Sequence, residues 1–223
     1  MRHQKIIELS EKARTAESSD AFWKICTKAL GASGVTGVGY GILPYSVDAK
    51  INGFSKAGFF RHTYSDDWAS AFTEKPVIDS DLSVELIVGG TLEILWNDDE
   101  IYEQASKSQK LQNDLENDIG MRFGASIALG RNAFGQAISG IGLCVGEIKS
   151  DKTFSTYWQE HQEQLRQMCH ILDEGLRSHH AQLLVRLTPR ERECLTYLAV
   201  GLRPAEICWR LKISEKTFEA HIR

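Results

Sequence analysis

The 223-residue chain lacks the features that mark several large classes of protein. No apolar run approaches the ~20 residues that a bilayer-spanning helix needs, and the N-terminal stretch MRHQKIIELSEKAR has no apolar signal-peptide core. The five cysteines are odd in number, widely spaced, and form no Cys-x-x-Cys pair, which argues against a disulfide framework and a zinc site. We therefore expect a cytoplasmic protein without a membrane partner, whose cysteines are small core residues.

Catalytic motifs are missing as well. The sequence has no G-x-S-x-G elbow, no H-E-x-x-H and no P-loop, and GVGYG lacks the spacing and the following helix of a dinucleotide fingerprint. His179 and His180 adjoin at a predicted helix end, where we interpret them as capping and surface residues rather than ligands. We expect a protein that is not an enzyme and that needs no metal or cofactor.

Charge is divided unevenly along the chain. Residues 186–223 contain eight Lys or Arg and five Asp or Glu, whereas residues 1–185 contain 18 and 25. A weakly basic segment suits a phosphate backbone, which would repel the acidic remainder. The two parts are therefore expected to have different partners.

The larger part alternates between helical and strand patterns. Apolar residues recur at helical spacing in KIIELSEKARTA, in AFWKICTKAL and over Asp151–His180, and two short helices are predicted at SDDWASAF and DSDLSVELIV. Strands are predicted at GVTGVGYGIL, TLEILW, GASIAL and QAISGIGLCVGEI, with GRNAFG as a turn. Because no βαβ unit repeats, we predict a central antiparallel sheet with helices on both faces, an α/β/α sandwich.

A polar stretch before the third of these strands has a helix-start signal. Asn97 with Glu100 fits a capping box, and Gly120 is suited to end a helix. The sequence therefore predicts one long polar helix from Asn97 to Gly120.

Residues 188–223 have the signals of three short helices. Thr188 and Glu191 fit a capping box for the first, Pro204 begins the second, and Ser214 caps the third. Two short helices joined by a tight turn form a helix-turn-helix, whose last helix can lie in a DNA major groove. Spacing predicts these inward-facing residues: Cys194, Leu195, Leu198, Ala199, Ile207 and Leu211.

The segment LTPRERECLTYLAVGLRPAEICWRLKISEKTFEAHIR resembles the DNA-binding module of LuxR-type transcription regulators. The matching residues are Glu191, Leu195, Gly201, Glu206, Ile207, Leu211, Ser214, Lys216, Thr217 and His221. The resemblance implies a four-helix module that binds double-stranded DNA as a dimer, with much of the dimer contact on the fourth helix. Here the chain ends within the third helix, so we expect either that the terminal part is missing or that the product is naturally truncated, and that DNA binding is weak.

Five residues of the last helix are the candidates for contact with DNA. Lys216 is placed for a phosphate, Thr217 for a phosphate or base edge, and Arg223 for a guanine, and His221 is presented by the same helix. Glu219 stands where the family often has a basic or base-reading residue. A carboxylate there repels phosphates, although it can accept from a cytosine amino group.

The larger part resembles the autoinducer-binding domain of the quorum-sensing branch of this family. Residues in the order and spacing of the family's pocket are Tyr64, Trp68, Phe72, Asp81, Trp96 and Gly124. The resemblance implies binding of an acyl-homoserine lactone or a similar small amphiphile. Phe72 replaces the commoner Tyr, and Leu82 replaces the Pro that follows the Asp, which removes one hydroxyl and some backbone rigidity.

Such a ligand offers a ring carbonyl, an amide and an apolar tail. In the implied arrangement Trp68 donates to the ring carbonyl, Asp81 accepts from the amide N–H, and Tyr64 donates to the amide carbonyl. Trp96 packs on the lactone, and Ser126 adds a hydroxyl. In the alternative interpretation the aromatic residues belong to the core and Asp81 is a helix cap.

We therefore expect an α+β protein of two domains, a small-ligand domain over residues 1–175 and an incomplete helix-turn-helix over residues 188–223, joined by a linker over residues 176–187. The leading hypothesis is a ligand-responsive regulator that binds DNA as a homodimer, and RNA polymerase as well if it is an activator. A DNA-incompetent antagonist that dimerises with a full-length relative is the alternative. The third hypothesis is a small-molecule hydrolase. Turnover of acyl-homoserine lactones by the protein would support it.

Overall fold

The computed structural model divides into two compact units, Met1–His180 and Ala181–Arg223, and each is described by itself. The structure describes residues 2–44, 58–71, 81–131, 137–184 and 188–222. The predicted turn GRNAFG falls largely outside these ranges.

A five-stranded sheet forms the centre of the first unit. Its strand order is β2-β1-β5-β4-β3, and each described pair is antiparallel, as predicted. The strands are β1 (Gly37–Pro44), β2 (Phe59–His62), β3 (Glu93–Leu95), β4 (Gly124–Arg131) and β5 (Ala137–Cys144). Strand β2 was not predicted, because a four-residue edge strand is too short to show an alternating pattern.

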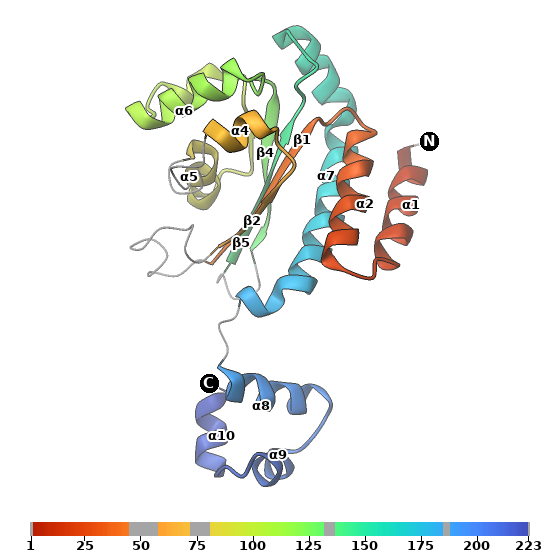
Figure 1. Ribbon diagram of the computed structural model, residues 1–223, viewed down its shortest axis with the longest axis vertical. Coiled ribbons are helices and arrows are strands. Elements are labelled where there is room, and N and C mark those ends of the chain that lie inside the picture. Colours follow the sequence, from red (N-terminus) through yellow and green to blue (C-terminus); the bar gives the residue numbers. More distant parts are fainter. Residues whose placement is uncertain (1, 45–57, 72–80, 132–136, 185–187, 223) are drawn as a thin grey trace. The chain divides into compact units, whose positions relative to one another are not determined.

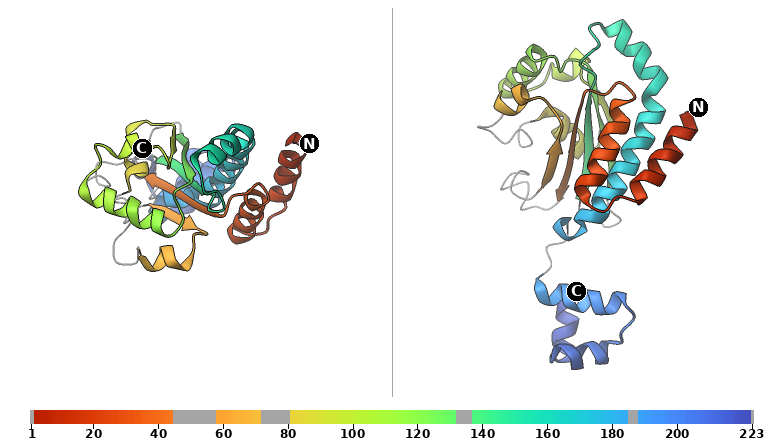
Figure 2. Two further views of the ribbon diagram at one scale, coloured as in Figure 1. Left: turned by 90° about the horizontal axis from the view of Figure 1, so that it is seen from above. Right: turned by 45° about the vertical axis from the view of Figure 1, so that its right-hand side comes forward.

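Helices cover both faces of this sheet, which confirms the α/β/α layers (Figure 1). Figure 2 shows the same two helical layers from other directions. One layer contains α1 (Arg2–Arg14), α2 (Ser19–Gly31) and α7 (Asp151–Leu184). The opposite layer contains α4 (Asp66–Ala71), α5 (Leu82–Gly89) and α6 (Lys107–Asp118).

The prediction of a single helix from Asn97 to Gly120 is wrong. A short 3-10 helix, Asp99–Tyr102, is followed by a break, and α6 begins only after Ser106. The predicted capping box of Asn97 with Glu100 is wrong, because Asp98 caps the 3-10 helix and the Asn97 amide donates to Asp151 instead. The capping box that forms is at Ser106: its hydroxyl accepts from the Gln109 backbone N–H at 3.3 Å, and the Gln109 side chain accepts from the Ser106 N–H at 2.8 Å. This local stop and restart sets the position of α6 over the sheet.

The sheet face toward α7 is closed by a buried polar network. The Tyr40 hydroxyl donates to Asp173 at 2.8 Å, and Arg177 Nε donates to both oxygens of the same carboxylate at 2.9 Å. Arg177 Nη2 also donates to the Gly130 carbonyl at 2.7 Å, which joins α7 to β4. Burial, followed by the charge of Asp173, raises the pKa of Tyr40, so the phenol stays a donor.

The second unit contains the three predicted helices, α8 (Pro189–Ala199), α9 (Pro204–Leu211) and α10 (Glu215–His221). The capping box of Thr188 with Glu191 is present. Leu195 is 39% exposed and Ala199 is exposed too, so these two predicted core positions are wrong. Leu198 and Leu211 pack inward as predicted, and Tyr197 does so as well, around this core: Cys194, Ile207, Cys208 and Phe218.

Two glycines in helices provide a stability prediction. A Cβ at Gly175 of α7 would collide with the Phe22 ring of α2, whereas a Cβ at Gly31 would meet open space. Alanine raises helix propensity by ~1 kcal/mol in a helix interior such as that of α7, and by less at Gly31, the last residue of α2. We expect Gly175→Ala to lower the free energy of unfolding by about 1–3 kcal/mol, because overpacking outweighs propensity, and Gly31→Ala to leave it unchanged or raise it.

Urea unfolding followed by circular dichroism measures both changes. Equal stabilisation by the two substitutions would show that α2 and α7 do not need the glycine for their close approach.

Candidate functional site

A cavity of about 120 Å³ lies between the sheet and the layer of α4, α5 and α6. The predicted ligand residues that the structure brings together around it are Tyr64, Trp68, Asp81, Trp96 and Ser126. They come from five separate places along the chain: the loop before α4, α4 itself, the start of α5, the residue after β3, and β4. Phe72 lies outside the described residues.

Glycines open part of the sheet side of this cavity, which is otherwise lined by strand side chains such as Leu43, Ser126 and Ile138. A Cβ at Gly39 or Gly142 would lie 2.5 or 2.7 Å from the Tyr64 hydroxyl oxygen, and one at Gly124 would collide with the Trp96 ring. The rings can therefore lie flat against the strands. In this position Tyr64 donates to the Gly142 carbonyl at 3.3 Å, and the Trp96 indole N–H donates to Ser126 Oγ at 2.8 Å.

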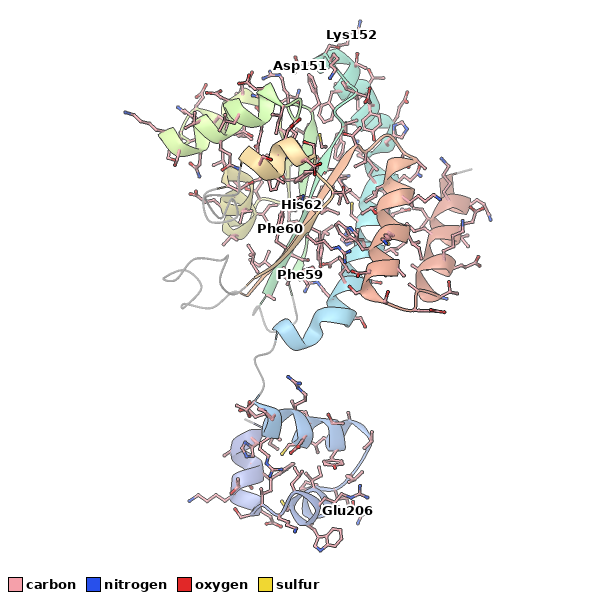
Figure 3. The ribbon with its side chains drawn as sticks, in the orientation of Figure 1. Phe59, Phe60, His62, Asp151, Lys152 and Glu206 are labelled. Atoms are coloured by element: carbon pink, nitrogen blue, oxygen red, sulfur yellow. The ribbon has the colours of Figure 1, made fainter. Side chains whose placement is uncertain are left out.

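Phe60, Tyr64 and Trp68 line one side of the cavity, and His62 packs against all three, so that the four rings form one aromatic wall. The Trp68 ring centroid lies 4.8 Å from that of His62 and 5.0 Å from that of Tyr64, and Phe60 stacks on His62. Figure 3 labels Phe60 and His62 on β2 together with Phe59, which instead packs against Tyr40. Burial lowers the pKa of His62, which favours a neutral ring in this wall.

Asp81 has two roles in the structure. One oxygen caps α5 by accepting from the Val84 N–H at 3.0 Å, and the other lies 3.5 Å from the Gln112 side-chain nitrogen. The residue also lines the cavity. Burial raises the pKa of Asp81, although hydrogen bonds from Val84 and Ser83 oppose the shift. The cap and the cavity position are therefore compatible in one side chain.

Glu116 of α6 is a cavity residue that the sequence analysis missed. The Trp68 indole N–H and the Gln112 amide both donate to its Oε1, each at 3.4 Å. Burial, followed by the negative charge of Asp81, raises the pKa of Glu116 to about 7, against those two hydrogen bonds. The only sequence signal was helical spacing, since these polar cavity residues form one stripe: Gln109, Gln112, Asn113 and Glu116. Such a stripe is normally a solvated helix face.

The candidate DNA-contacting residues lie mainly on the outer side of α10. Lys216, Thr217 and Glu219 are exposed, and His221 is half-buried. Phe218, 2% exposed, anchors the helix in the core of its unit. Arg223 lies outside the described residues.

The turns around α9 fix the start of α10. Glu206, labelled in Figure 3, accepts from the Arg203 backbone N–H at 2.8 Å, so it caps α9 where residue 203 has no hydroxyl. Lys212 ends α9 in the left-handed conformation, with φ of 53°. Ser214 then accepts from the Thr217 N–H at 3.1 Å, which begins α10.

The described ranges contain no helix that is both long and apolar enough to cross a membrane. Within the same ranges, no three His, Cys, Asp or Glu side chains are grouped so that they could hold a metal ion. The five cysteines are buried free thiols.

Comparisons with known proteins divide the chain into the same ligand-binding and DNA-binding parts that the sequence predicts. The family model described as autoinducer binding domain matches residues 18–175, and the one described as bacterial regulatory proteins, luxR family, matches residues 185–223. No curated protein matches the chain as a relative in sequence.

Solved structures with a similar fold include LuxR-family regulators. The N-acylhomoserine lactone dependent factor CepR2 from Burkholderia cenocepacia has a TM-score of 0.62 at 13% identity, over 81% of this chain and 98% of its own. SdiA from Escherichia coli has a TM-score of 0.59 at 17% identity, over 99% of this chain and 86% of its own. SdiA in complex with octanoyl-rac-glycerol has a TM-score of 0.58 at 17% identity, over 99% and 84%.

At these identities the structures show a shared fold, whereas the two family models together match most of the sequence. The chain therefore belongs to the LuxR family of bacterial transcription regulators, with a quorum-sensing autoinducer-binding domain followed by a helix-turn-helix DNA-binding domain.

Proposed function

We propose that the protein is a cytoplasmic, non-enzymatic transcription regulator that binds an acyl-homoserine lactone or a similar small amphiphile and binds operator DNA as a homodimer. The observation that supports it best is the cavity, which is lined by hydrogen-bonding side chains and apolar side chains together. Residues 1–175 would bind the ligand and residues 188–223 the DNA. Residues 176–187 would connect them, the first nine as the end of α7.

Three polar groups of the cavity make long hydrogen bonds within the protein. Trp68 to Glu116 is 3.4 Å, Tyr64 to the Gly142 carbonyl is 3.3 Å, and Gln112 to Asp81 is 3.5 Å. The usual distances are about 2.9–3.0 Å for N–H···O and about 2.7–2.8 Å for O–H···O, so these bonds are weak and a ligand can replace them at small cost. We propose that Trp68 donates to the ring carbonyl, Tyr64 to the amide carbonyl, and that Asp81 accepts from the amide N–H.

The bond from Trp96 to Ser126 is of ordinary length, 2.8 Å. In the proposal these two residues keep their bond, with the indole face packed against the lactone ring and the Ser126 hydroxyl still able to donate. The acyl tail would then lie among these apolar lining residues: Leu43, Ile87, Val88 and Ile138. Each buried CH₂ contributes about 0.8 kcal/mol, so tail length would set much of the affinity.

The SdiA structure with octanoyl-rac-glycerol supports the broader ligand class, since that molecule also joins a polar head to an acyl chain. If the protein is an activator, RNA polymerase would be a further partner.

A panel of acyl-homoserine lactones tests the proposal. Ligand binding should raise the melting temperature, because at 100 times its dissociation constant a ligand adds ~2.7 kcal/mol to the free energy of unfolding when the unfolded chain does not bind it. Differential scanning calorimetry measures the shift. If no member of the panel moves the melting temperature, this ligand class is wrong.

Two substitutions separate the roles of Asp81 in this test. Asp81→Asn keeps a good cap for α5, whereas Asp81→Ala removes it at a cost of ~1 kcal/mol. Both remove the carboxylate that would accept the ligand's amide N–H. We therefore expect both to bind the best lactone of the panel at least tenfold more weakly, with only Asp81→Ala lowering the melting temperature of the protein alone. Unchanged lactone binding by Asp81→Asn would make Asp81 a cap and nothing more.

Paired substitutions on α10 test the DNA-binding proposal. Lys216→Gln removes a positive charge and should weaken binding to a promoter duplex and reduce the slope of log affinity against log salt by about 1. Glu219→Gln removes a repulsive carboxylate at an exposed position of the same helix and should strengthen binding.

Fluorescence anisotropy at several salt concentrations measures both. A chain that binds no duplex, yet forms mixed dimers with a longer relative, would favour the antagonist alternative. Equal effects of the two substitutions would place the DNA contact elsewhere.

A further inference from the structure

The outer face of α6 is apolar at its centre. Leu111 is 60% exposed and Leu115 is 40% exposed. Because residues four positions apart lie on the same side of a helix, the two leucines form one exposed stripe. The inner face of α6 instead turns these polar side chains toward the cavity: Gln109, Gln112, Asn113 and Glu116. A helix in this orientation loses hydrophobic burial within its own domain.

Charged side chains extend the stripe in both directions. Lys107 lies one turn before Leu111, and Asp118 lies three residues after Leu115, so helical spacing places all four on one face. Both charged residues are exposed. Among the described residues, neither of them forms an ion pair. The outer face of α6 therefore has a positive charge at its start, leucines at its centre and a negative charge at its end.

This order of charges is unfavourable within the helix itself. The N-terminal end of a helix has a partial positive charge and the C-terminal end a partial negative charge. Lys107 is the first residue of α6 and Asp118 is its last, and the helix has no acidic residue in its first turn and no basic residue in its last. Each charge thus lies at the helix end that repels it.

An antiparallel copy of the same helix complements this face. A two-fold axis between the leucines brings Leu111 against the partner subunit's Leu115, and Lys107 beside the partner subunit's Asp118. Each end of one helix then lies beside the oppositely charged end of the other, which offsets the unfavourable order of charges. A parallel copy would place lysine beside lysine and aspartate beside aspartate. Most oligomers of identical chains form by such a two-fold contact of one surface with itself.

We infer that the outer face of α6 is a contact surface between two copies of this chain, which pair antiparallel through Leu111 and Leu115 and through Lys107 with the partner subunit's Asp118. The inference deepens the proposed function, because it names a surface that joins the proposed homodimer. Two 12-residue helices form a contact smaller than the roughly 1,600 Å² of a standard interface. The dimer should therefore be weak and depend on protein concentration.

Exchange of charge between Lys107 and Asp118 tests the pairing, with sedimentation equilibrium of the full chain measuring the dissociation constant of the dimer. Lys107→Glu places a carboxylate beside the partner subunit's Asp118 at two symmetric contacts and should weaken the dimer about tenfold. Asp118→Lys places two lysines together and should weaken it by about as much. Lys24→Glu makes the same change of charge at an exposed position of α2 and should have no such effect.

A mixture of the two weakened variants gives the sharpest result. In a mixed dimer the introduced carboxylate of one chain faces the introduced amine of the other, and the original pair remains at the second contact. The mixture should therefore dimerise about as tightly as the unsubstituted chain. Only an antiparallel contact between these two positions predicts this recovery.

The leucines are tested in the same measurement. Leu111→Gln should weaken the dimer about tenfold, because two apolar contacts are lost at once. Ile7→Gln, a matched change at a side chain 51% exposed on α1, should leave the dimer unchanged. The melting temperature should stay the same in all of these variants, since each changed side chain is exposed, which separates loss of pairing from loss of folding.

The outcomes separate this contact from the proposed function. If the chain dimerises but the α6 variants do not weaken the dimer, or the mixture stays as weak as its components, the α6 contact is contradicted while the proposed homodimer stands. If Lys24→Glu or Ile7→Gln weakens the dimer as much, the contact is contradicted in the same way. A chain that stays monomeric up to about 100 μM contradicts the contact and the homodimer together. Binding of a lactone does not depend on α6 pairing, so a rise in melting temperature would still support the ligand site.

Discussion

The ligand domain depends on the close approach of two aromatic rings to glycines on one face of its sheet. Gly39, Gly142 and Gly124 lie where Tyr64 and Trp96 touch the strands, and any larger residue would push these rings outward. Glycine weakens a strand, because it adds backbone entropy to the unfolded chain and no packing to the folded one. Here that loss makes room for the rings and leaves space above them. The cavity therefore exists because the strands have no side chains at these glycines.

The opposite face of the same sheet compensates for this weakness. Tyr40, Asp173 and Arg177 connect β1, β4 and α7 through buried hydrogen bonds of 2.7–2.9 Å. Such bonds are short and well satisfied, whereas those that line the cavity are 3.3–3.5 Å long at Tyr64, Trp68 and Asp81. One face of the sheet therefore holds the domain together, and the other has polar groups that can exchange partners.

Much of this arrangement followed from local sequence signals. The capping residues Thr188 and Ser214 are each hydrogen-bonded to the start of the helix that they were expected to begin. Local signals gave a wrong prediction where two of them competed for the start of one helix. The helix begins after the capping box of Ser106 with Gln109, and not at Asn97, so the predicted long helix is divided in two. Strand β2 was missed because its partner β1 is distant in sequence and only pairing stabilises so short a strand.

Site residues were predictable only where a known family pattern marks them. Tyr64, Trp68, Asp81, Trp96 and Ser126 were expected at the pocket from resemblance, and the structure places them around one cavity. Glu116 had no such mark, because an acidic residue on a polar helix looks like one that faces water. Its position depends on the tertiary orientation of α6, which exposes leucines and buries glutamines. Side-chain spacing alone does not say which face of such a helix turns inward.

The central claim is that a small amphiphile binds in the cavity by taking over weak internal hydrogen bonds. The indole N–H resonances of the tryptophans test it most directly in a ¹⁵N-labelled protein. On addition of whichever amphiphile raises the melting temperature, the Trp68 resonance should shift strongly as its N–H leaves Glu116, while that of Trp209, 81% exposed on α9, should serve as the unaffected reference. A stabilising ligand that leaves the Trp68 resonance unmoved would show that it binds elsewhere.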